Sequence, residues 1–369
     1  MVSEERVRQA LRSVLDPEIG KPIEDLGMLQ RIEVEDGLVR VHVLLTIAGC
    51  PLKDRIDREV RGALADVEGV REVEVALGEM TGDQREQLVG QLRGDQPPQQ
   101  TFFTDGDTEV IAVASGKGGV GKSSVTANLA VALSASGYRV GVLDADVWGF
   151  SIPRMLGVSG QPVAFNNMIL PLEVQGVKVI SMGFFVPDEQ PVIWRGPMLH
   201  KALQQFLGDV YWGDLDFLLI DMPPGTGDVS LSLASFLPGG SMLVVTTPQD
   251  AARKVAERAG RMAHHPNVKL RLLGVVENMA GFVCPHCGEI TDVFGRGGGE
   301  MTAEALGAPF LGHVPMQISL REGSDTGTPV VGSEPDSPAG LAFRDLADRV
   351  AKSTKTKVGK QLPLTVAPR

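Results

Sequence analysis

The segment Ser115-Gly-Lys-Gly-Gly-Val-Gly-Lys-Ser-Ser124 restricts the possible folds more than any other part of the chain. It satisfies the pattern G-x-x-x-x-G-K-[ST], a phosphate-binding loop when it joins a strand to the start of a helix. The apolar run Val110 to Ala114 precedes it, and a segment rich in Ala, Leu and Val follows. Backbone N–H groups and the helix N-terminus can then surround the phosphates. The segment therefore predicts a nucleotide-binding α/β domain.

From Glu109 onward, β-type and helical runs alternate. Such alternation predicts a doubly wound, mainly parallel sheet of the P-loop NTPase type, with ligands at the carboxyl ends of the strands. The expected strands are residues 110–114, 140–143, 177–181, 217–220, 242–246 and 270–276, and the expected helices begin at residues 122, 198, 251 and 339.

A small α/β module is expected before this domain. Residues 1–80 show a helical pattern, two β-rich runs around Asp36-Gly37, a second helical stretch and a final strand. Residues 81–107 are rich in Gln, Asp, Gly and Pro, which predicts a flexible linker. The nucleotide-binding domain is then expected over residues 108–353, and a polar, basic and disordered tail over residues 354–369.

Composition limits the classes of function. The net charge of -11 argues against general affinity for nucleic acid. No apolar run is long enough for a membrane span or for the core of a signal peptide, which predicts a cytoplasmic protein without stable membrane association. Three cysteines are too few for a disulfide scaffold and are better interpreted as ligands or redox groups.

The loop residues have predicted roles in binding a nucleotide and magnesium. Lys122 should reach the outer phosphates, and the Ser123 hydroxyl should hold Mg²⁺. The nucleotide contacts are expected from Gly116, Gly118, Gly119, Val120, Gly121, Lys122, Ser123 and Ser124.

Two apolar strands end in aspartates beside this loop. We assign Asp221, at the end of Leu218-Leu-Ile-Asp221, to magnesium through water. Asp146 is expected to position or activate the attacking water, and Asp144 to support the metal site. Asp228 is equally well a switch residue or a helix N-cap.

The lysine directly after Gly116 resembles the deviant Walker A motif of the MinD, ParA and nitrogenase iron-protein class of NTPases. That resemblance implies that Lys117 acts in trans, reaching the nucleotide of a partner across a two-fold interface. A cation that arrives with dimerisation stabilises charge developing on the phosphates. Hydrolysis would then depend on assembly of a homodimer.

A cysteine pair, Cys284-Pro-His-Cys287, follows the strand expected at residues 270–276, so we expect it to lie on an exposed loop at the end of that strand. An iron–sulfur cluster usually requires four ligands, so two chains could hold one 4Fe-4S cluster across a two-fold axis. Zinc bound by the same four thiolates is the alternative.

Residues 105–350 resemble the Mrp (ApbC) family of P-loop ATPases that carry iron–sulfur clusters. The matching stretches are Trp194-Arg-Gly-Pro-Met198, Trp212-Gly-Asp-Leu-Asp216, Leu219-Ile-Asp-Met-Pro-Pro-Gly-Thr-Gly-Asp228, Val276-Glu-Asn-Met279 and the cysteine pair. The resemblance implies ATP hydrolysis, a bridging cluster on Cys284 and Cys287, and Asn278 reading the adenine edge. Apoproteins and cluster donor proteins are the implied partners.

Residues 1–80 resemble the small domain of metal–sulfur cluster biosynthesis proteins, through Asp16-Pro-Glu18, Asp25-Leu-Gly27 and Leu45-Thr-Ile-Ala-Gly-Cys-Pro51. Cys50 is then either a reactive or ligand thiol or a small packed residue. The alternative function for the whole chain is a MinD- or ParA-type positioning or partitioning ATPase whose cysteine pair binds structural zinc.

Overall fold

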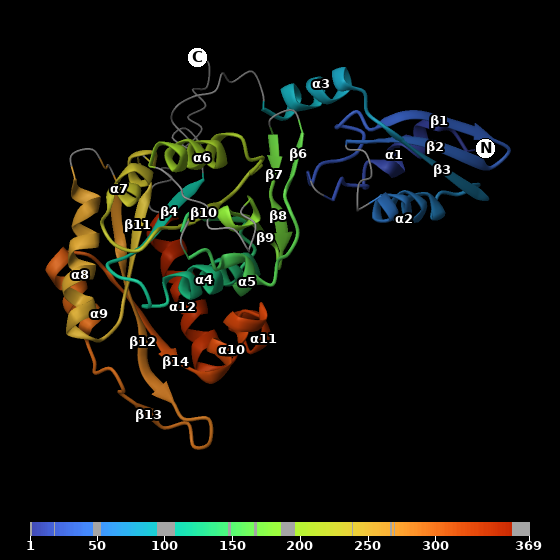
Figure 1. The fold of residues 1–369 in the computed structure, drawn as a ribbon. Coiled ribbons are helices and arrows are strands. Elements are labelled where there is room, and N and C mark those ends of the chain that lie inside the picture. Colours follow the sequence, from blue (N-terminus) through green and yellow to red (C-terminus); the bar gives the residue numbers. More distant parts are fainter. Residues whose placement is uncertain are drawn as a thin grey trace, which may run out of the picture. The chain divides into compact units, whose positions relative to one another are not determined.

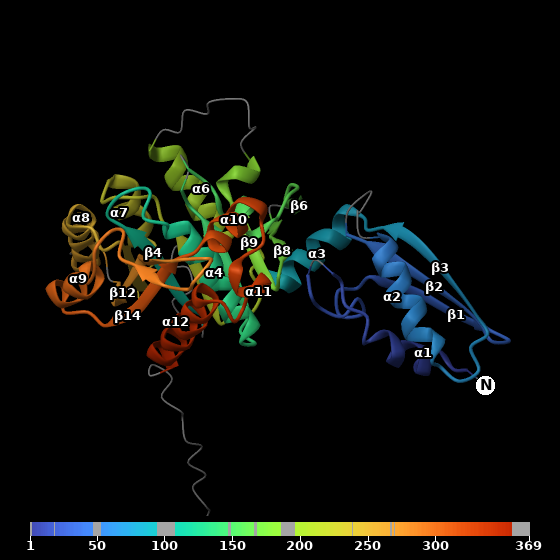
Figure 2. The ribbon, with the colours of Figure 1, turned by 90° about the horizontal axis from the view of Figure 1, so that it is seen from below.

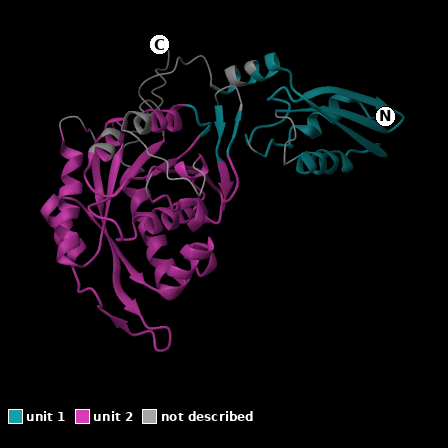
Figure 3. Ribbon diagram, in the orientation of Figure 1, with its two compact units in different colours: residues 1–99, 162–171, 209–213 teal, residues 100–161, 172–208, 214–369 magenta. Residues whose placement is uncertain are grey.

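The fold is that of a computed structural model (Figure 1). The structure describes residues 2–17, 19–46, 53–93, 108–146, 149–165, 168–185, 196–237, 239–265, 268 and 270–355. It divides into two compact units (Figure 3). The first comprises Met1–Gln99, Pro162–Pro171 and Asp209–Gly213, and the second comprises Gln100–Gln161, Leu172–Gly208 and Asp214–Arg369.

The first unit contains the expected small α/β module. Its three-stranded sheet has the order β1 (Leu29–Glu35), β2 (Leu38–Leu45) and β3 (Glu72–Glu79), in which β1 pairs antiparallel and β3 parallel with β2. Two amphipathic helices, α1 (Glu4–Leu11) and α2 (Lys53–Ala65), contribute buried side chains to its core. The buried residues of these helices recur at helical spacing: Val7 and Leu11, then Ile56, Val60 and Leu64.

Part of the expected linker over residues 81–107 forms regular structure. Residues Gly82–Arg93 form helix α3, which is a correction to the sequence expectation. Leu88 is 2% exposed and shares a core with Met168 and Leu170. Those two residues belong to a hairpin, β6 (Val163–Phe165) with β7 (Met168–Leu170), that the pattern of residues 81–107 could not reveal. Residues 94–107 lie outside the described part of the chain.

The second unit is built on a nine-stranded sheet in the order β13-β12-β11-β4-β10-β5-β9-β8, with β14 also paired to β12. In this sheet β8 pairs antiparallel with β9, and β13 pairs antiparallel with β12. The other described pairs of the sheet are parallel, which confirms the expected doubly wound class. The bounds are β4 (Glu109–Ser115), β5 (Val140–Asp144), β8 (Leu172–Val174), β9 (Val177–Ser181), β10 (Phe217–Asp221), β11 (Ser241–Thr246), β12 (Arg271–Val283), β13 (Ile290–Thr291) and β14 (Phe310–Met316).

Helices cover both faces of this sheet (Figures 1 and 2). Helix α4 (Lys122–Ala135) packs against α12 (Pro338–Lys355) on one face, and its residues Val125 to Leu133 are all buried. On the other face α8 (Asp250–Arg261) packs against α9 (Gly298–Leu306). Helix α12 extends to Lys355, two residues into the tail expected over residues 354–369, and residues from 356 onward lie outside the described part.

The remaining elements are helices and 3-10 turns around the sheet. They are α5 (Ile152–Leu156), α6 (Gly196–Gly208), α7 (Asp228–Ser235), α10 (Ile318–Thr326), α11 (Val330–Ser333) and two 3-10 turns, η1 (Met182–Phe185) and η2 (Met262–His264). In the described part of the chain, no helix combines the length and apolar character needed to cross a membrane.

Candidate functional site

The glycine-lysine loop connects β4 to α4 at the centre of the sheet, as the sequence predicts. Gly119 and Gly121 have φ values of 79° and 78°, a left-handed conformation that favours glycine. A β-carbon on Gly116 would lie 2.2 Å from the carbonyl carbon of Val255 in α8. The loop backbone can therefore take this course only with glycine at these positions.

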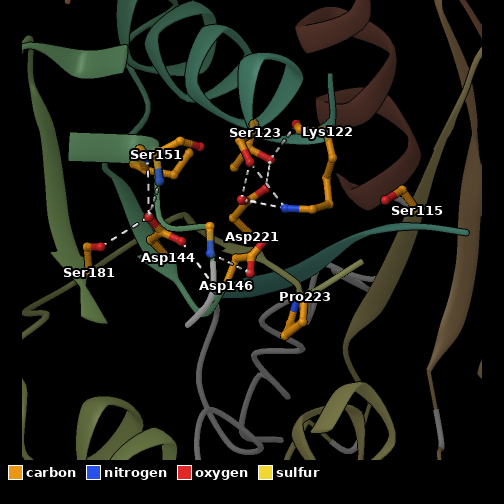
Figure 4. Close-up of polar contacts among 12 residues, drawn as sticks. Ser115, Lys122, Ser123, Asp144, Asp146, Ser151, Ser181, Asp221 and Pro223 are labelled. Carbon is orange, nitrogen blue, oxygen red and sulfur yellow. Dashed lines mark hydrogen bonds and ion pairs between the residues drawn. The ribbon is translucent and has the colours of Figure 1, made fainter. Parts of the chain in front are cut away.

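The first polar centre joins the loop to the end of β10 (Figure 4). The Lys122 ammonium lies 2.5 Å from Asp221 Oδ2, and both side chains are buried. The Ser123 hydroxyl donates to the same oxygen at 2.6 Å. A buried lysine and aspartate compensate each other's charge, so removing either would leave an unpaired buried ion.

Sequence reasoning missed Thr126 in this centre. Its hydroxyl, which is fully buried, donates to Asp221 Oδ1 at 2.7 Å and also contacts the Lys122 carbonyl. Both carboxylate oxygens of Asp221 are therefore held by residues of α4. The available signal was spacing, because Thr126 lies one helical turn after Lys122 and faces the same side.

A second polar centre surrounds Asp144 at the end of β5. Its Oδ2 accepts hydrogen bonds from the backbone N–H groups of Ser151 and Ile152, at 3.1 and 3.2 Å, and from the Ser181 hydroxyl at 3.0 Å. Its Oδ1 accepts from Asp146 N–H at 3.2 Å. Asp144 thus fixes the start of α5 and the end of β9, and Ser181 is another residue that sequence reasoning missed.

Asp146 lies two residues further along and is 8% exposed. Its Oδ1 accepts a hydrogen bond from Gly149 N–H at 3.2 Å, which holds the side chain at the start of the following loop (Figure 4). The assignments of Asp144 to the metal and Asp146 to the attacking water stay predictions.

The environment of Asp144 disfavours its charged form. Burial and the negative charge of Asp221 raise the pKa of Asp144 to about 7, against the opposing effects of Lys122, Ser181 and the Ile152 N–H. In the protein without nucleotide, the Asp144 carboxyl group should therefore contribute fully to the free energy of unfolding at pH values below about 4, which is its pKa in the unfolded chain. This contribution should be lost as the pH rises through about 7, the pKa in the folded protein. We expect Asp144→Asn to abolish this decrease, measured by urea unfolding between about pH 5 and pH 8.

The matched control is Asp216→Asn. A hydrogen bond from Arg139 lowers the pKa of Asp216, so its contribution to stability disappears only at pH values below the usual range of an aspartate. The free energy of unfolding of Asp216→Asn should therefore decrease with pH as that of the wild type does, between about pH 5 and pH 8. If the free energy of unfolding of Asp144→Asn decreases with pH as steeply as that of the wild type, another group causes the decrease.

Lys117 is half-buried and lies between the half-buried Gly116 and the exposed Gly118. The Ser115 hydroxyl donates to its carbonyl at 3.0 Å, which fixes its backbone. Among the residues that the structure describes, none forms an ion pair with its ammonium. Asp228 is the first residue of α7, and the N-cap of this helix is Gly227, so the helix N-cap considered for Asp228 is a correction, whereas its role as a switch residue stays a prediction.

Asn278 lies on β12 and contacts the loop directly. Its Nδ2 donates to the Val120 carbonyl at 2.9 Å, and the side chain is 5% exposed. The structure therefore brings Asn278 to the phosphate loop, whereas the adenine contact implied by resemblance stays a prediction.

The cysteine pair forms the tip of a hairpin after β12. Phe282 and Val283 pair with Thr291 and Ile290 of β13, and residues 285–290 are exposed. The turn is closed by Cys284 N–H donating to the Glu289 carbonyl and by Gly288 N–H donating to the Cys284 carbonyl, both at 2.9 Å. The expectation of an exposed loop at the end of a strand is confirmed.

The hairpin also activates one thiol. Hydrogen bonds from the backbone N–H groups of Cys287 and His286, and from the Cys287 side chain, lower the pKa of Cys284. Cys284 is half-buried and Cys287 is exposed. Within the described residues no group of three or more Cys, His, Asp or Glu is placed to hold a metal, so this pair offers two thiolates per chain. Cys50 lies outside the described residues.

These geometries support two kinds of chemistry. The loop amides, Lys122 and the helix N-terminus suit phosphate groups, and the oxygen ligands of Ser123 and Asp221 suit Mg²⁺. The cysteine hairpin suits a soft metal or a cluster that takes further ligands from elsewhere.

Comparison with known proteins adds two family matches. Residues 107–351 match the family described as NUBPL iron-transfer P-loop NTPase, and residues 4–76 match the family described as iron-sulfur cluster assembly protein.

Individual relatives cover nearly the whole chain. A protein from Mycobacterium tuberculosis named iron-sulfur cluster carrier protein is 50% identical over 97% of this chain and 96% of its own length. One of the same name from Deinococcus radiodurans is 42% identical over 96% and 98%. A solved nucleotide-binding protein from Archaeoglobus fulgidus, in complex with ADP, shares 40% identity with a TM-score of 0.53, and covers 60% of this chain and 88% of that one.

Proposed function

The chain belongs to the family of NUBPL iron-transfer P-loop NTPases, and on that basis we propose that it is an ATP-hydrolysing carrier of iron–sulfur clusters. Two copies would hold one 4Fe-4S cluster between their cysteine hairpins and deliver it to apoproteins. The observation that carries the proposal is the presence, in one unit, of a complete phosphate loop and an exposed Cys284–Cys287 hairpin with an activated thiol.

The residues around the loop fit magnesium and ATP. The Ser123 hydroxyl and the Asp221 carboxylate are hard oxygen ligands placed 2.6 Å apart, so they would hold Mg²⁺ directly or through water. Bound Mg²⁺ would neutralise charge on the phosphates. Lys122 would exchange its contact with Asp221 for the outer phosphates, while Thr126 keeps that carboxylate in place.

Two further groups would act on the reaction itself. Asp146 would orient the attacking water, and Lys117 of a second copy would stabilise the charge that develops on the transferred phosphoryl group. Hydrolysis would therefore be slow in the monomer, because Lys117 has no path to its own outer phosphates in this scheme. The requirement for Lys117 of a second copy would therefore make the rate of ATP hydrolysis depend on formation of the dimer that holds the cluster.

The cluster is treated as cargo. Two thiolates from each copy complete the four ligands that such a cluster requires, and backbone N–H groups directed at Cys284 stabilise the thiolate form. Because the hairpin tip is exposed, an apoprotein or a cluster donor could approach the cargo directly. The names of the full-length relatives favour this function over a positioning or partitioning ATPase. We place the carrier in the cytoplasm, with such donors and apoproteins as its partners.

The test is anaerobic reconstitution of the whole chain with iron and sulfide. We expect an absorption spectrum typical of a 4Fe-4S cluster, about four iron atoms per dimer, and transfer of the cluster to an apo-ferredoxin. ATP and Mg²⁺ should change the rate of transfer.

Reconstitution with zinc provides the contrasting result. If the chain takes up zinc at one ion per dimer and forms no cluster, the hairpins are a structural clasp and the carrier function is refuted. A cluster at one per monomer would refute the bridging arrangement while leaving the carrier function intact.

A further inference from the structure

One strand connects the phosphate loop to the cysteine hairpin. Strand β12 (Arg271–Val283) carries Asn278, which contacts the loop, and Cys284 follows its last residue. Only five residues of a single backbone therefore lie between the nucleotide site and the cargo site, although the two sites serve different chemistry.

The contact with the loop is made by Asn278, and Met279 follows it in the strand. Asn278 Nδ2 donates to the Val120 carbonyl, and it would lie 2.2 Å from a β-carbon on Gly121. The ε-methyl of Met279 would lie 3.7 Å from that same β-carbon, at ordinary packing distance. A displacement of Val120 or Gly121, which directly precede Lys122, must therefore be accommodated by Asn278.

The strand is irregular immediately after this contact. Asn278 pairs with Val314 and Phe282 pairs with Met316, so four steps along β12 match two steps along β14. Within this bulge Met279 has a φ of 58°, which is uncommon for a residue with a side chain, and Gly281 has a φ of 79°. The extra residues and the left-handed methionine interrupt the regular pairing of β12 with β14 at this point.

The bulge contacts the cysteine hairpin at its other end. A β-carbon on Gly281 would lie 2.5 Å from Cγ2 of Ile290, which belongs to β13 and pairs with Val283. A change in the backbone at Gly281 therefore moves β13 relative to β12, and the turn that carries Cys284 and Cys287 lies between these two strands.

On the N-terminal side the strand is fixed. Glu277 is 1% exposed, accepts a hydrogen bond from Gly299 N–H at 2.6 Å and contacts His313 Nδ1 at 3.1 Å. These contacts hold β12 to α9 and β14. A displacement of Asn278 should therefore shift the residues that follow it, toward the hairpin, more than the residues that precede it in the sheet.

We propose that the bulge at Met279–Gly281 transmits the state of the phosphate loop to the cysteine hairpin. In this scheme Met279 is a positioning residue: it directly follows Asn278, which contacts the loop, and its backbone sets the presentation of Cys284 and Cys287. The inference rests on the proposed function, since it explains how nucleotide regulates the hold on cargo.

The test uses the cluster-free protein, so that it does not depend on iron binding. We would measure site-resolved alkylation rates of Cys284 and Cys287 by mass spectrometry, with and without adenylyl imidodiphosphate and Mg²⁺. In the wild type we expect the nucleotide to change the rate at Cys284 by about fivefold or more. Met279→Gly keeps the positive φ accessible but removes the side chain next to Asn278 and loosens the backbone of the bulge, so its response should fall below about twofold.

Two further measurements isolate the bulge. Met279→Gly should bind the analogue and form dimers by light scattering as the wild type does, and Met301→Ala, which removes a methionine on α9 that is 44% exposed, should keep the full response. The proposal is overturned by a wild type without a response, by an unchanged response in Met279→Gly, or by loss of nucleotide binding or dimers in that variant. Absence of iron uptake in the wild type would instead refute the carrier function, with the alkylation result unaffected.

Discussion

Lys117→Ala is expected to lower kcat for ATP hydrolysis by about 10³-fold while leaving ATP affinity nearly unchanged. A cation supplied across an interface to a phosphoryl transition state typically contributes about 10³ to 10⁵ in rate. Affinity is preserved because Lys122, the loop amides and Ser123 remain in place. Single-turnover hydrolysis and fluorescent-nucleotide titration measure the two quantities separately. Lys53→Ala, an exposed lysine at the start of α2, should change neither.

A mixing experiment shows whether this lysine acts in trans. Ser123→Ala impairs its own site but still offers Lys117 to a partner, whereas Lys117→Ala has an intact loop. Mixed dimers should therefore recover part of the activity that each variant lacks, in the sites of the Lys117→Ala chains. If the mixture stays as inactive as its components, Lys117 acts within its own chain, and the coupling of hydrolysis to dimerisation is refuted.

Replacing both Cys284 and Cys287 with alanine is expected to abolish cluster binding. Each dimer would lose all four thiolates, so bound iron should fall from about four atoms per dimer to background. Because one thiol is half-buried and the other exposed, the free energy of unfolding should change by about 0.5 kcal/mol or less. Iron counts, absorption spectra and urea unfolding measure these effects.

Cys50→Ala provides the comparison for this variant. It should bind iron as the wild type does if the hairpin is the cargo site. Full iron binding by the Cys284/Cys287 double variant, with loss in Cys50→Ala, would move the cargo site to the first unit and would contradict the bridging arrangement.

The nucleotide site was largely predictable because its signals are local. Gly121 and Lys122 lie in one short motif, and Asp144 and Asp221 end apolar strands that must meet at one edge of a parallel sheet. The doubly wound class follows from the same alternation. Sequence reasoning also placed the cysteine pair on an exposed turn, since it follows a buried strand directly.

The features that were missed depend on partners distant in the sequence. Helix α3 is stabilised where Leu88 meets Met168 and Leu170, and residues 81–107 carry no sign of those partners. Ser181 looks like an ordinary strand end until Asp144 is placed beside it. Strand β14 was not predicted, because its sequence Phe-Leu-Gly-His-Val-Pro-Met includes a glycine and a proline that usually interrupt strands.

The order of the strands has a consequence for how the protein is made. Strand β4 lies between β10 and β11, and more than 100 residues separate Ser115 from Phe217. At about 5–20 residues per second, a ribosome needs at least about five seconds to deliver the first of these neighbours. During this time the apolar β4 is unpaired on the nascent chain. The first unit likewise cannot be completed until residues 162–171 have been synthesised. Biosynthesis of this protein should accordingly depend on chaperones that shield β4 until β10 emerges.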